Sequence, residues 1–464
     1  MRYFISILLT VAFSALKAQE LAHTMKIQDE GNVDVIGSFE SVLGGYITIS
    51  QSGAEDADGN HLIINRLDND MNCTAGQKIL LSDATSYYHA AEDAEGNIYA
   101  VGINYNSGDY DGVIIKISQD GTLHWMTHLG NDDWDSLDRV VIMDDYLLVV
   151  GWTYSSGTGF QDLMYGAVAF DGSIISEQFL SLDANVEVVD LAFNDTGEPL
   201  FLLNQRVGGN YAYSIYAWQN DAWVSVFNDY TDGNLIAQCF DIYQSKLAIG
   251  YNYSVDESDY NWVLRLFDEN QFNTFTFDQG NDFDYQFSDL IYDDIVLMIG
   301  HQNQYGLGGH DILVQQVNAE AIFVHAITFG EGEDDFARHV MRTSDGGFLV
   351  SGTTELQDHT RDTYLVKWDE HEVYGFSYTE AESSTQCDYV LSIDHFQNGS
   401  LSVQVLKDEI IFNTTISSFS ILNIVGQELV AGSNSNRVSI ASLPAGVYFL
   451  ADKSAGRVLK FYHH

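Results

Sequence analysis

The chain is poor in proline, cysteine and basic side chains. Only two of its 464 residues are proline and three are cysteine. Lysine and arginine number 19 against 67 aspartate and glutamate residues, so the formal net charge is 19 − 67 = −48. A surface this negative repels phosphate backbones and anionic lipid headgroups. The composition therefore argues against nucleic acids and peripheral membrane surfaces as partners.

What the chain does contain is suited to a folded all-β protein. Hydrophobic residues make up 45% and aromatic residues 13% of the sequence, which is enough to build a core. Its 39 glycines, 27 tyrosines and 26 phenylalanines are typical of many short strands joined by glycine-containing turns.

Long apolar runs are absent after the N-terminus, so no transmembrane segment is expected in the mature chain. Residues 1–18 have the features of a secretory signal peptide: Arg2, a short apolar run from Phe4 to Phe13, and a small residue, Ala18, before the polar Gln19. The run is shorter than the about 20 residues that a membrane-spanning helix needs. The alternative is a buried first strand.

The three cysteines, Cys73, Cys239 and Cys387, are far apart and odd in number. This pattern is neither a disulfide framework nor a zinc site. We expect ordinary buried cysteines, with at most one long-range bridge.

A repeat of about 50 residues dominates the chain from about residue 30 to 370. A short apolar segment closes on a small residue at positions 50, 102, 151, 204, 250, 300 and 352, and the spacings are 52, 49, 53, 46, 50 and 52. Each closing residue is followed by a polar loop and another apolar strand. Units of this length are typical of four-stranded propeller blades, which must stack to hide both faces. The repeat predicts a seven-bladed β-propeller, and the alternative is a two-layer β-sandwich with coincidental spacing.

Two details of this propeller stay open in the sequence. The closing residue is glycine in five units but Ser50 and Asn204 in the others, and the glycines either allow a sharp bend or let neighbouring backbone approach. The strand that completes the last blade is either the segment Leu21–Ile27 or the segment His371–Tyr378.

The repeat ends near Asp369, and a second module follows. We expect a signal peptide at 1–18, the propeller at 19–379, a polar linker at 380–387 and a small antiparallel β-sandwich at 388–464.

The end of the chain resembles the type A C-terminal sorting domain of type IX secretion substrates in Bacteroidota. The resemblance covers roughly the last 65–75 residues, in the order SILNIVGQELV, SIASLPAGVYFLAD and RVLKFY. The matching positions are Ile421, Asn423, Gly426, Gln427, Leu443, Gly446, Tyr448, Leu450 and Lys460. Tyr462, His463 and His464 after Lys460 depart from the pattern.

The resemblance implies an export address. In that family the domain directs cargo through the outer membrane, a sortase-like protease commonly removes it, and the cargo is released or attached to the cell surface. The type IX machinery and its sortase are therefore the implied partners. The propeller repeats are also similar to the glycine- and aspartate-rich repeats of such secreted proteins. The alternative for the tail is a generic β-sandwich adhesion module.

Acidic loops recur at 130–138, 280–289 and 330–336, about 20 residues before a closing glycine. Clustered carboxylates suit Ca²⁺, which takes six to eight oxygen ligands. The candidate ligands are Asp132, Asp133, Asp135, Asp282, Asp284, Asp334 and Asp335. The alternative is that they are solvated turn acids.

No catalytic motif stands out: HExxH, GxSxG, CxxC and a phosphate loop are all missing. We therefore expect a binding or scaffold module with a glycan or protein ligand at one propeller face. The alternative is an extracellular polysaccharide hydrolase with carboxylates around the propeller channel, and a third is a purely structural surface protein. Aromatic residues such as Trp134, Trp218, Trp223 and Tyr213 either stack on sugars or pack between blades.

Overall fold

A computed structural model describes most of the chain beyond its first 22 residues. The described residues are 23–28, 32–53, 60–81, 85–106, 109–154, 156–207, 210–220, 222–230, 235–256, 259–268, 271–277, 285–293, 295–303, 309–330, 332–357, 359–368, 378–379, 383–387, 389–393, 403–405, 409–423, 427–444, 446–453 and 457–463. The predicted signal peptide lies outside these residues. Within them, no helix is long and apolar enough to cross a membrane.

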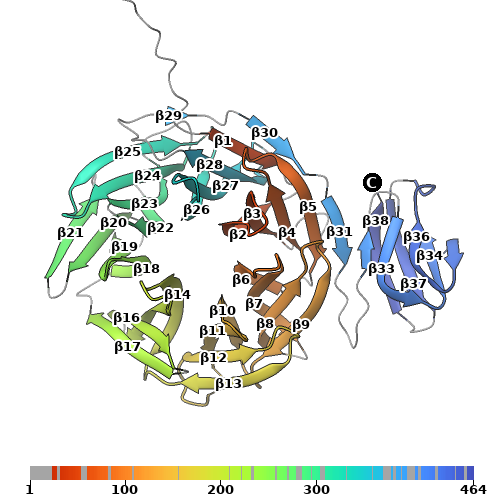
Figure 1. Cartoon of the computed structure of the whole chain (residues 1–464), viewed down its shortest axis with the longest axis horizontal. Coiled ribbons are helices and arrows are strands. Elements are labelled where there is room, and N and C mark those ends of the chain that lie inside the picture. Colours follow the sequence, from red (N-terminus) through yellow and green to blue (C-terminus); the bar gives the residue numbers. More distant parts are fainter. Residues whose placement is uncertain are drawn as a thin grey trace, which may run out of the picture.

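The described elements are strands, and most of them form antiparallel sheets arranged around a ring (Figure 1). Sheets 1 to 3 are β2 (Val33–Glu40), β3 (Tyr46–Ser52), β4 (His61–Leu67) and β5 (Cys73–Leu80); β6 (Thr85–Glu92), β7 (Ile98–Asn106), β8 (Asp109–Ile117) and β9 (Leu123–Leu129); and β10 (Asp135–Ile142), β11 (Leu147–Thr153), β12 (Asp162–Val168) and β13 (Ile174–Leu180). Sheets 4 and 5 are β14 (Asn185–Phe193), β15 (Pro199–Val207), β16 (Asn210–Gln219) and β17 (Ala222–Tyr230); and β18 (Leu235–Tyr243), β19 (Lys246–Asp256), β20 (Asp259–Asp268) and β21 (Gln271–Phe277). Sheets 6 and 7 are β22 (Tyr285–Tyr292), β23 (Ile295–Gln302), β24 (Asp311–Asn318) and β25 (Phe323–Phe329); and β26 (Asp335–Arg342), β27 (Phe348–Glu355), β28 (Arg361–Trp368) and β1 (His23–Gln28). The predicted all-β class and propeller fold are confirmed.

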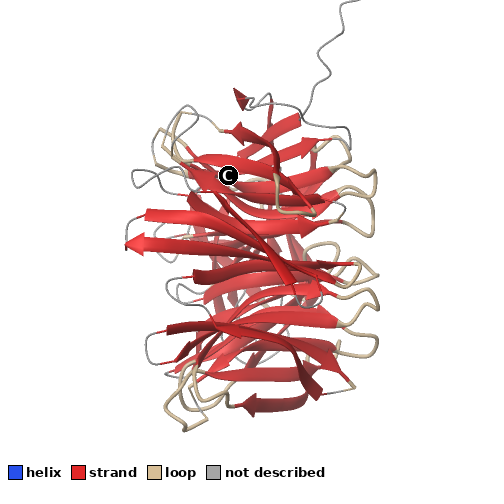
Figure 2. Ribbon diagram, turned by 90° about the vertical axis from the view of Figure 1, so that its left-hand side faces the viewer, coloured by secondary structure: helices blue, strands red, loops and turns tan. Residues whose placement is uncertain are grey.

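The core of the ring lies between neighbouring sheets. Along β11, Leu147 and Val149 pack toward sheet 2, whereas Leu148 and Val150 pack toward sheet 4. Successive residues of a strand point to opposite faces, and here both faces are covered. This is why the repeated segments are continuous apolar runs and why stacked sheets, seen edge-on in Figure 2, are stable where one sheet alone is not.

Four of the five closing glycines are required by close backbone contact, whereas a Cβ at Gly250 would meet side chains. The first strand of each of sheets 1–7 lies nearest the axis of the ring (Figure 1), and we call it the inner strand. Each inner strand carries a β-bulge. In sheet 2 the bulge lies between Tyr87 and His89, opposite the closing residue Gly102. A Cβ at Gly102 would lie 1.9 Å from the carbonyl oxygen of Ser86. The same conflict would arise at Gly151, Gly300 and Gly352. Close approach, not a sharp bend, therefore explains these glycines.

Many of the acidic residues hold hairpin turns. The Asp93 carboxylate accepts hydrogen bonds from the N–H groups of Glu95 (3.0 Å) and Asn97 (2.8 Å), and Gly96 follows with φ of 81°. Asp68 binds its turn in the same way, and Asn194 and Asn318 make the same pattern with a neutral side chain. Part of the large acidic excess therefore serves local turn geometry.

The N-terminal strand completes the last sheet. β1 pairs antiparallel with β28, so of the two candidates the segment Leu21–Ile27, of which residues 23–27 are described, provides the fourth strand of sheet 7. Of the competing segment His371–Tyr378, only Tyr378 is described; it belongs to β29 (Tyr378–Thr379) and pairs with β25 instead.

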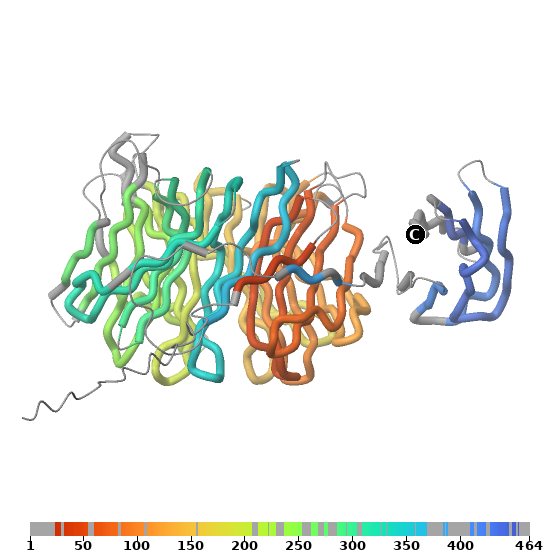
Figure 3. The backbone as a smooth tube through the Cα atoms, turned by 90° about the horizontal axis from the view of Figure 1, so that it is seen from above, coloured from red at the N-terminus to blue at the C-terminus, as the bar shows by residue number. Residues whose placement is uncertain are grey.

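After β28 the chain runs along the outside of the ring as a strap. β29, β30 (Ser383–Gln386) and β31 (Tyr389–Ile393) add in parallel to the outer strands of sheets 6, 7 and 1 in turn. Figures 1 and 3 show this segment crossing from the ring toward the C-terminal module. The predicted linker at 380–387 is thus partly a paired strand, because the exposed edge of β1 offers free backbone partners.

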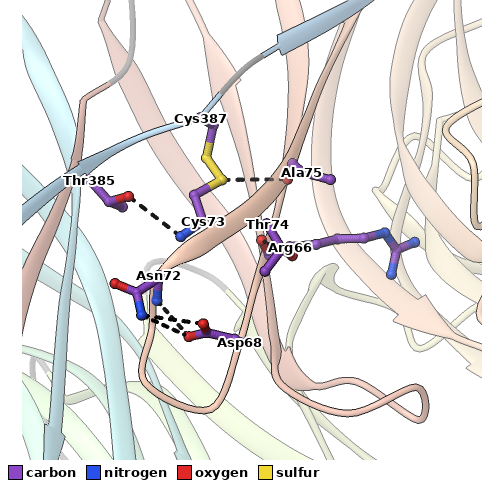
Figure 4. The surroundings of a disulfide bond; sticks show 8 residues. All are labelled: Arg66, Asp68, Asn72, Cys73, Thr74, Ala75, Thr385 and Cys387. Atoms are coloured by element: carbon purple, nitrogen blue, oxygen red, sulfur yellow. Dashed lines mark hydrogen bonds between the residues drawn. A yellow bond between two sulfur atoms is a disulfide. The ribbon is translucent and has the colours of Figure 1, made fainter.

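A disulfide secures the strap. Cys73 at the start of β5 is bonded to Cys387, 314 residues away, with Cα atoms 5.4 Å apart (Figure 4). Cys73 N–H also lies 3.5 Å from the hydroxyl of Thr385 in β30. Cys239 is free and buried. The one long-range bridge that the sequence allowed is therefore present, and it ties sheet 7 to sheet 1.

The C-terminal residues form two further layers. The sheet of β31 continues through β32 (Val403–Val405), β33 (Glu409–Ile416) and β36 (Ser435–Ser439). Sheet 8 contains β35 (Glu428–Gly432), β34 (Phe419–Asn423), β37 (Gly446–Asp452) and β38 (Arg457–His463). Ile410, Phe412, Ile421 and Leu450 lie in a common core, and Leu80 of β5 packs against it. The module is therefore joined to the ring by both sheet pairing and apolar contact.

Candidate functional site

The upper face of the ring, which we define as the face where first and third strands begin, carries exposed aromatic side chains. Tyr105 and Tyr110 are directly paired across β7 and β8, and Trp134 comes immediately before β10. The ring centroids of Tyr105 and Tyr110 are 5.2 Å apart, as are those of Tyr110 and Trp134. Tyr105 is 50% and Trp134 52% exposed. We call Tyr105, Tyr110 and Trp134 the aromatic ladder.

Backbone contacts hold the ladder in place. Tyr154, which follows β11, donates its N–H to the carbonyl oxygen of Trp134 (2.9 Å). The carboxylates of Asp109 and Asp133 accept the N–H groups of Tyr110 (2.8 Å) and Trp134 (2.9 Å). Two large rings thus stay half in water beside acidic acceptors.

The structure separates the aromatic residues that the sequence singled out. Tyr87, Tyr213 and Tyr251 are buried between sheets, and Trp218 packs edge-on against Trp223. Trp134 alone of the tryptophans named there is exposed. Tyr105 and Tyr110 were missed, although their positions on either side of the loop between second and third strands place them on the upper face.

Of the candidate calcium ligands, Asp282 and Asp284 lie outside the described residues. Asp132 and Asp133 are exposed, whereas Asp135 and Asp335 are buried. Asp135 accepts the N–H of Asn131 at 2.7 Å, and Asp334 accepts the N–H of His310 at 2.7 Å. Within the part of the chain that the structure describes, no three or more His, Cys, Asp or Glu side chains are grouped to hold a metal. The described acids with these contacts serve loop structure.

The inner strands carry a second group of ionisable side chains. Asp190, Asp241 and Asp289 each accept one backbone N–H from their own strand and one from the next sheet. The donors in the next sheet are Phe240, Tyr292 and Val340, each at 2.9 Å. These carboxylates therefore join neighbouring sheets around the axis of the ring.

Burial shifts the titration of these groups. It raises the pKa of Asp190 and Asp241 to about 6, and that of Asp138 to about 7. The pKa of Asp289 is raised well above its usual value by burial and by the nearby charge of Asp190. Clustered shifts of this kind mark functional sites or structural networks, and the backbone contacts of Asp190, Asp241 and Asp289 identify a structural network here.

The same inner wall also carries Arg139 and two histidines, His89 and His339, and His339 lies 4.0 Å from Asp289. Arg139 donates to the backbone carbonyl of Val189 in sheet 4, and Val140 N–H lies 3.4 Å from the His89 ring. Burial lowers the pKa of His339 to about 4, helped by the charge of Arg139, and it lowers the pKa of His89 well below its usual value.

We expect acidification to stabilise the ring. An acid whose folded pKa is raised binds its proton more tightly in the folded state, so its contribution is lost as pH rises from about 4 to 7. Four such acids outnumber the two histidines, whose lowered pKa values act in the opposite direction below pH 6.5. The midpoint of thermal unfolding should therefore fall as pH rises from 5.5 to 7.5 at high salt, where general charge repulsion is screened.

The variant Asp241→Asn should flatten that slope. Asp345→Asn is the control, because Asp345 binds Lys367 at 2.6 Å and the pKa of its carboxyl is lowered to about 2, outside the tested range. Equal pH profiles for wild type and Asp241→Asn would contradict the assignment.

The predicted sorting residues are brought together in the C-terminal module. Ile421 pairs with Leu450, and Asn423 pairs with Tyr448, across β34 and β37. Leu443 is buried in the same core, and the Tyr448 hydroxyl donates to the Pro444 carbonyl oxygen at 2.6 Å. Gln427 N–H donates to the Asn423 side chain at 2.9 Å. Gly446 pairs with His463 and Lys460 with Phe449, while Gly426 lies outside the described residues. These residues therefore have structural roles in a compact module.

Comparison with known proteins shows the fold. No protein-family model and no curated protein matches the chain. A polysaccharide lyase of family PL25, an ulvan lyase bound to -[GlcA(1-4)Rha3S]-, has a TM-score of 0.51 at 10% identity and covers 75% of this chain and 96% of its own. YCF48 bound to D1 peptide has a TM-score of 0.46 at 11% identity, covering 76% and 97%. The extracellular domain of a protein described as a hybrid two component system from B. thetaiotaomicron has 0.44 at 10%, covering 94% and 57%. Identities this low establish the fold alone.

Proposed function

We propose that the chain is a secreted or cell-surface binding protein: a seven-bladed β-propeller made of sheets 1–7, with a glycan or protein ligand on its upper face. The single observation that supports this function is the exposed aromatic ladder, two of whose rings are half in water. The buried acids Asp190, Asp241 and Asp289 support it indirectly. Their carboxylates accept backbone N–H groups of the next sheet, so their role is to join the sheets and not to catalyse a reaction.

A glycan array with the purified full chain tests the binding function. We expect a ligand signal that the substitution Trp134→Ala removes, because the indole is the largest exposed ring of the ladder. Phe193→Ala is the matched control, since Phe193 is also 50% exposed but ends a first strand on the opposite face. A signal that survives Trp134→Ala would place the ligand elsewhere.

One observation favours the alternative of an extracellular polysaccharide hydrolase. Burial raises the pKa of Asp138 to about 7, and the nearby charge of Glu187 adds to this rise. A protonated acid beside a carboxylate is the pair that glycoside hydrolysis uses. Release of reducing ends from any polysaccharide, abolished by Asp138→Asn, would replace the binding function with this one.

We further propose that residues 388–464 form a type IX sorting sandwich that takes the protein to the cell exterior. The resemblance of its motif residues supports this proposal, and four of them, Ile421, Leu443, Tyr448 and Leu450, share one core. The Cys73–Cys387 disulfide suits an oxidising compartment. A chain ending at Cys387 keeps the disulfide and β30, so its ring should still fold.

That truncated chain should accumulate inside the cell envelope, whereas the full chain should reach the medium or the outer surface. Fractionation and immunoblotting measure the distribution. Equal export of both chains would exclude the sorting role.

A further inference from the structure

The charge around the aromatic ladder restricts which ligands it can accept. The three upper-face loops that surround it, residues 103–112, 130–138 and 151–162, contain no lysine or arginine. Of their seven aspartates, Asp135, Asp138 and Asp162 are buried, which leaves Asp109, Asp111, Asp132 and Asp133 at least partly exposed. Asp132 and Asp133 are exposed beside Trp134. A polymer that carries carboxylate or sulfate groups is repelled at such a surface, because no cation is present in these loops to pair with it.

The exposed large hydrophobic residues of these loops are all aromatic. They are Tyr105, Trp134 and Phe160, whereas exposed aliphatic side chains such as Ile175, Val226 and Ile322 lie elsewhere, on the outer strands β13 and β17 and next to β25. Aromatic rings surrounded by oxygen acceptors suit a sugar, which offers C–H groups to a ring face and hydroxyl donors to carboxylates.

The angles between the rings indicate the physical form of that sugar. The planes of Tyr105 and Tyr110 meet at 66°, and those of Tyr110 and Trp134 meet at 62°. A flat crystalline polymer requires coplanar rings, whereas a single flexible chain can turn from one ring to the next.

We propose that the aromatic ladder binds a single, soluble and uncharged polysaccharide chain. This inference rests on the proposed binding function and specifies its ligand class. Sugar rings stack on Trp134 and Tyr105, and the neighbouring aspartates accept hydrogen bonds from sugar hydroxyl groups.

Affinity electrophoresis of the full chain tests the inference. The gels contain either a neutral polymer (hydroxyethyl cellulose, mixed-linkage β-glucan or galactomannan) or an anionic one (alginate or dextran sulfate). We expect retardation by at least one neutral polymer and by neither anionic one, with an affinity that changes less than twofold between 50 and 500 mM salt. Trp134→Ala and Tyr110→Ala should each weaken it at least tenfold, and Phe193→Ala should leave it unchanged.

Three other results would overturn the inference. Retardation by an anionic polymer would show that the acidic loops do not select against charge. Salt-sensitive binding of polylysine, lost in Trp134→Ala, would identify a basic peptide ligand and would leave the proposed binding function standing. Absence of retardation by every polymer, while the glycan array gives a Trp134-dependent signal, would exclude soluble neutral chains but not the binding face.

Discussion

Replacing Cys387 by serine is expected to lower the midpoint of thermal unfolding by about 6 °C. The Cys73–Cys387 bond closes a loop of 314 residues. In the chain-entropy description, closing such a loop destabilises the unfolded chain by about 6 kcal/mol. An unfolding entropy of about 2 cal/mol/K per residue amounts to about 0.9 kcal/mol/K for the 464 residues of the chain. Dividing the lost free energy by this entropy gives the expected shift of the midpoint.

Three controls isolate the bond from other effects of the substitution. Cys73→Ser should give the same shift, and the double variant should show no further loss, because one bond is removed in each case. A reductant should destabilise the wild type but not the variants. Thiol counting in denaturant should find one free cysteine, Cys239, in the wild type. A wild-type midpoint for Cys387→Ser would show that the strap is held without the disulfide.

Replacing Gly102 by alanine is expected to destabilise sheet 2 by about 3 kcal/mol. The added methyl group would meet the Ser86 carbonyl oxygen at 1.9 Å and the Cα atom of Tyr87 at 2.7 Å. Because these are backbone atoms at a β-bulge, they cannot move without disturbing the inner strand. Chemical denaturation and thermal unfolding both measure the loss.

Gly37→Ala is the matched control for this substitution. Gly37 also lies in an inner strand, yet a Cβ there would have no atom within 4 Å. We expect no loss of stability, and a small gain is consistent with the cost of glycine in a strand. Equal effects of Gly102→Ala and Gly37→Ala would show that close backbone approach is not what requires the glycine.

The strands of the ring could be predicted closely because local signals specify them. Continuous apolar runs such as Leu147–Val150 occur where both faces of a strand are covered, and they recur at the repeat period. The excess of aspartate is equally clear from the sequence, but the role of each aspartate could not be predicted from it. Asp93 binds its own turn and Asp190 binds the next sheet, and sequence alone does not distinguish these roles from metal binding.

The aromatic ladder shows why part of the site was missed. Trp134 was recognised as a candidate, whereas Tyr105 and Tyr110 become its neighbours only when sheets 2 and 3 stack. The pairing of Cys73 with Cys387 has the same origin, since these residues meet only after the ring has closed.

The sequence by itself determined the all-β class, the repeat period, the acidic surface and the segments that become strands, because each of these depends on residues close together in the chain. Only the tertiary structure decided which strand completes sheet 7, that β29, β30 and β31 pair along the outside of three sheets, and which of the many aromatic residues remain in water. Those outcomes depend on contacts between residues as far apart in the chain as Met25 and Ser383 (383 − 25 = 358 positions), and such contacts exist only once the sheets have stacked to bury their apolar faces.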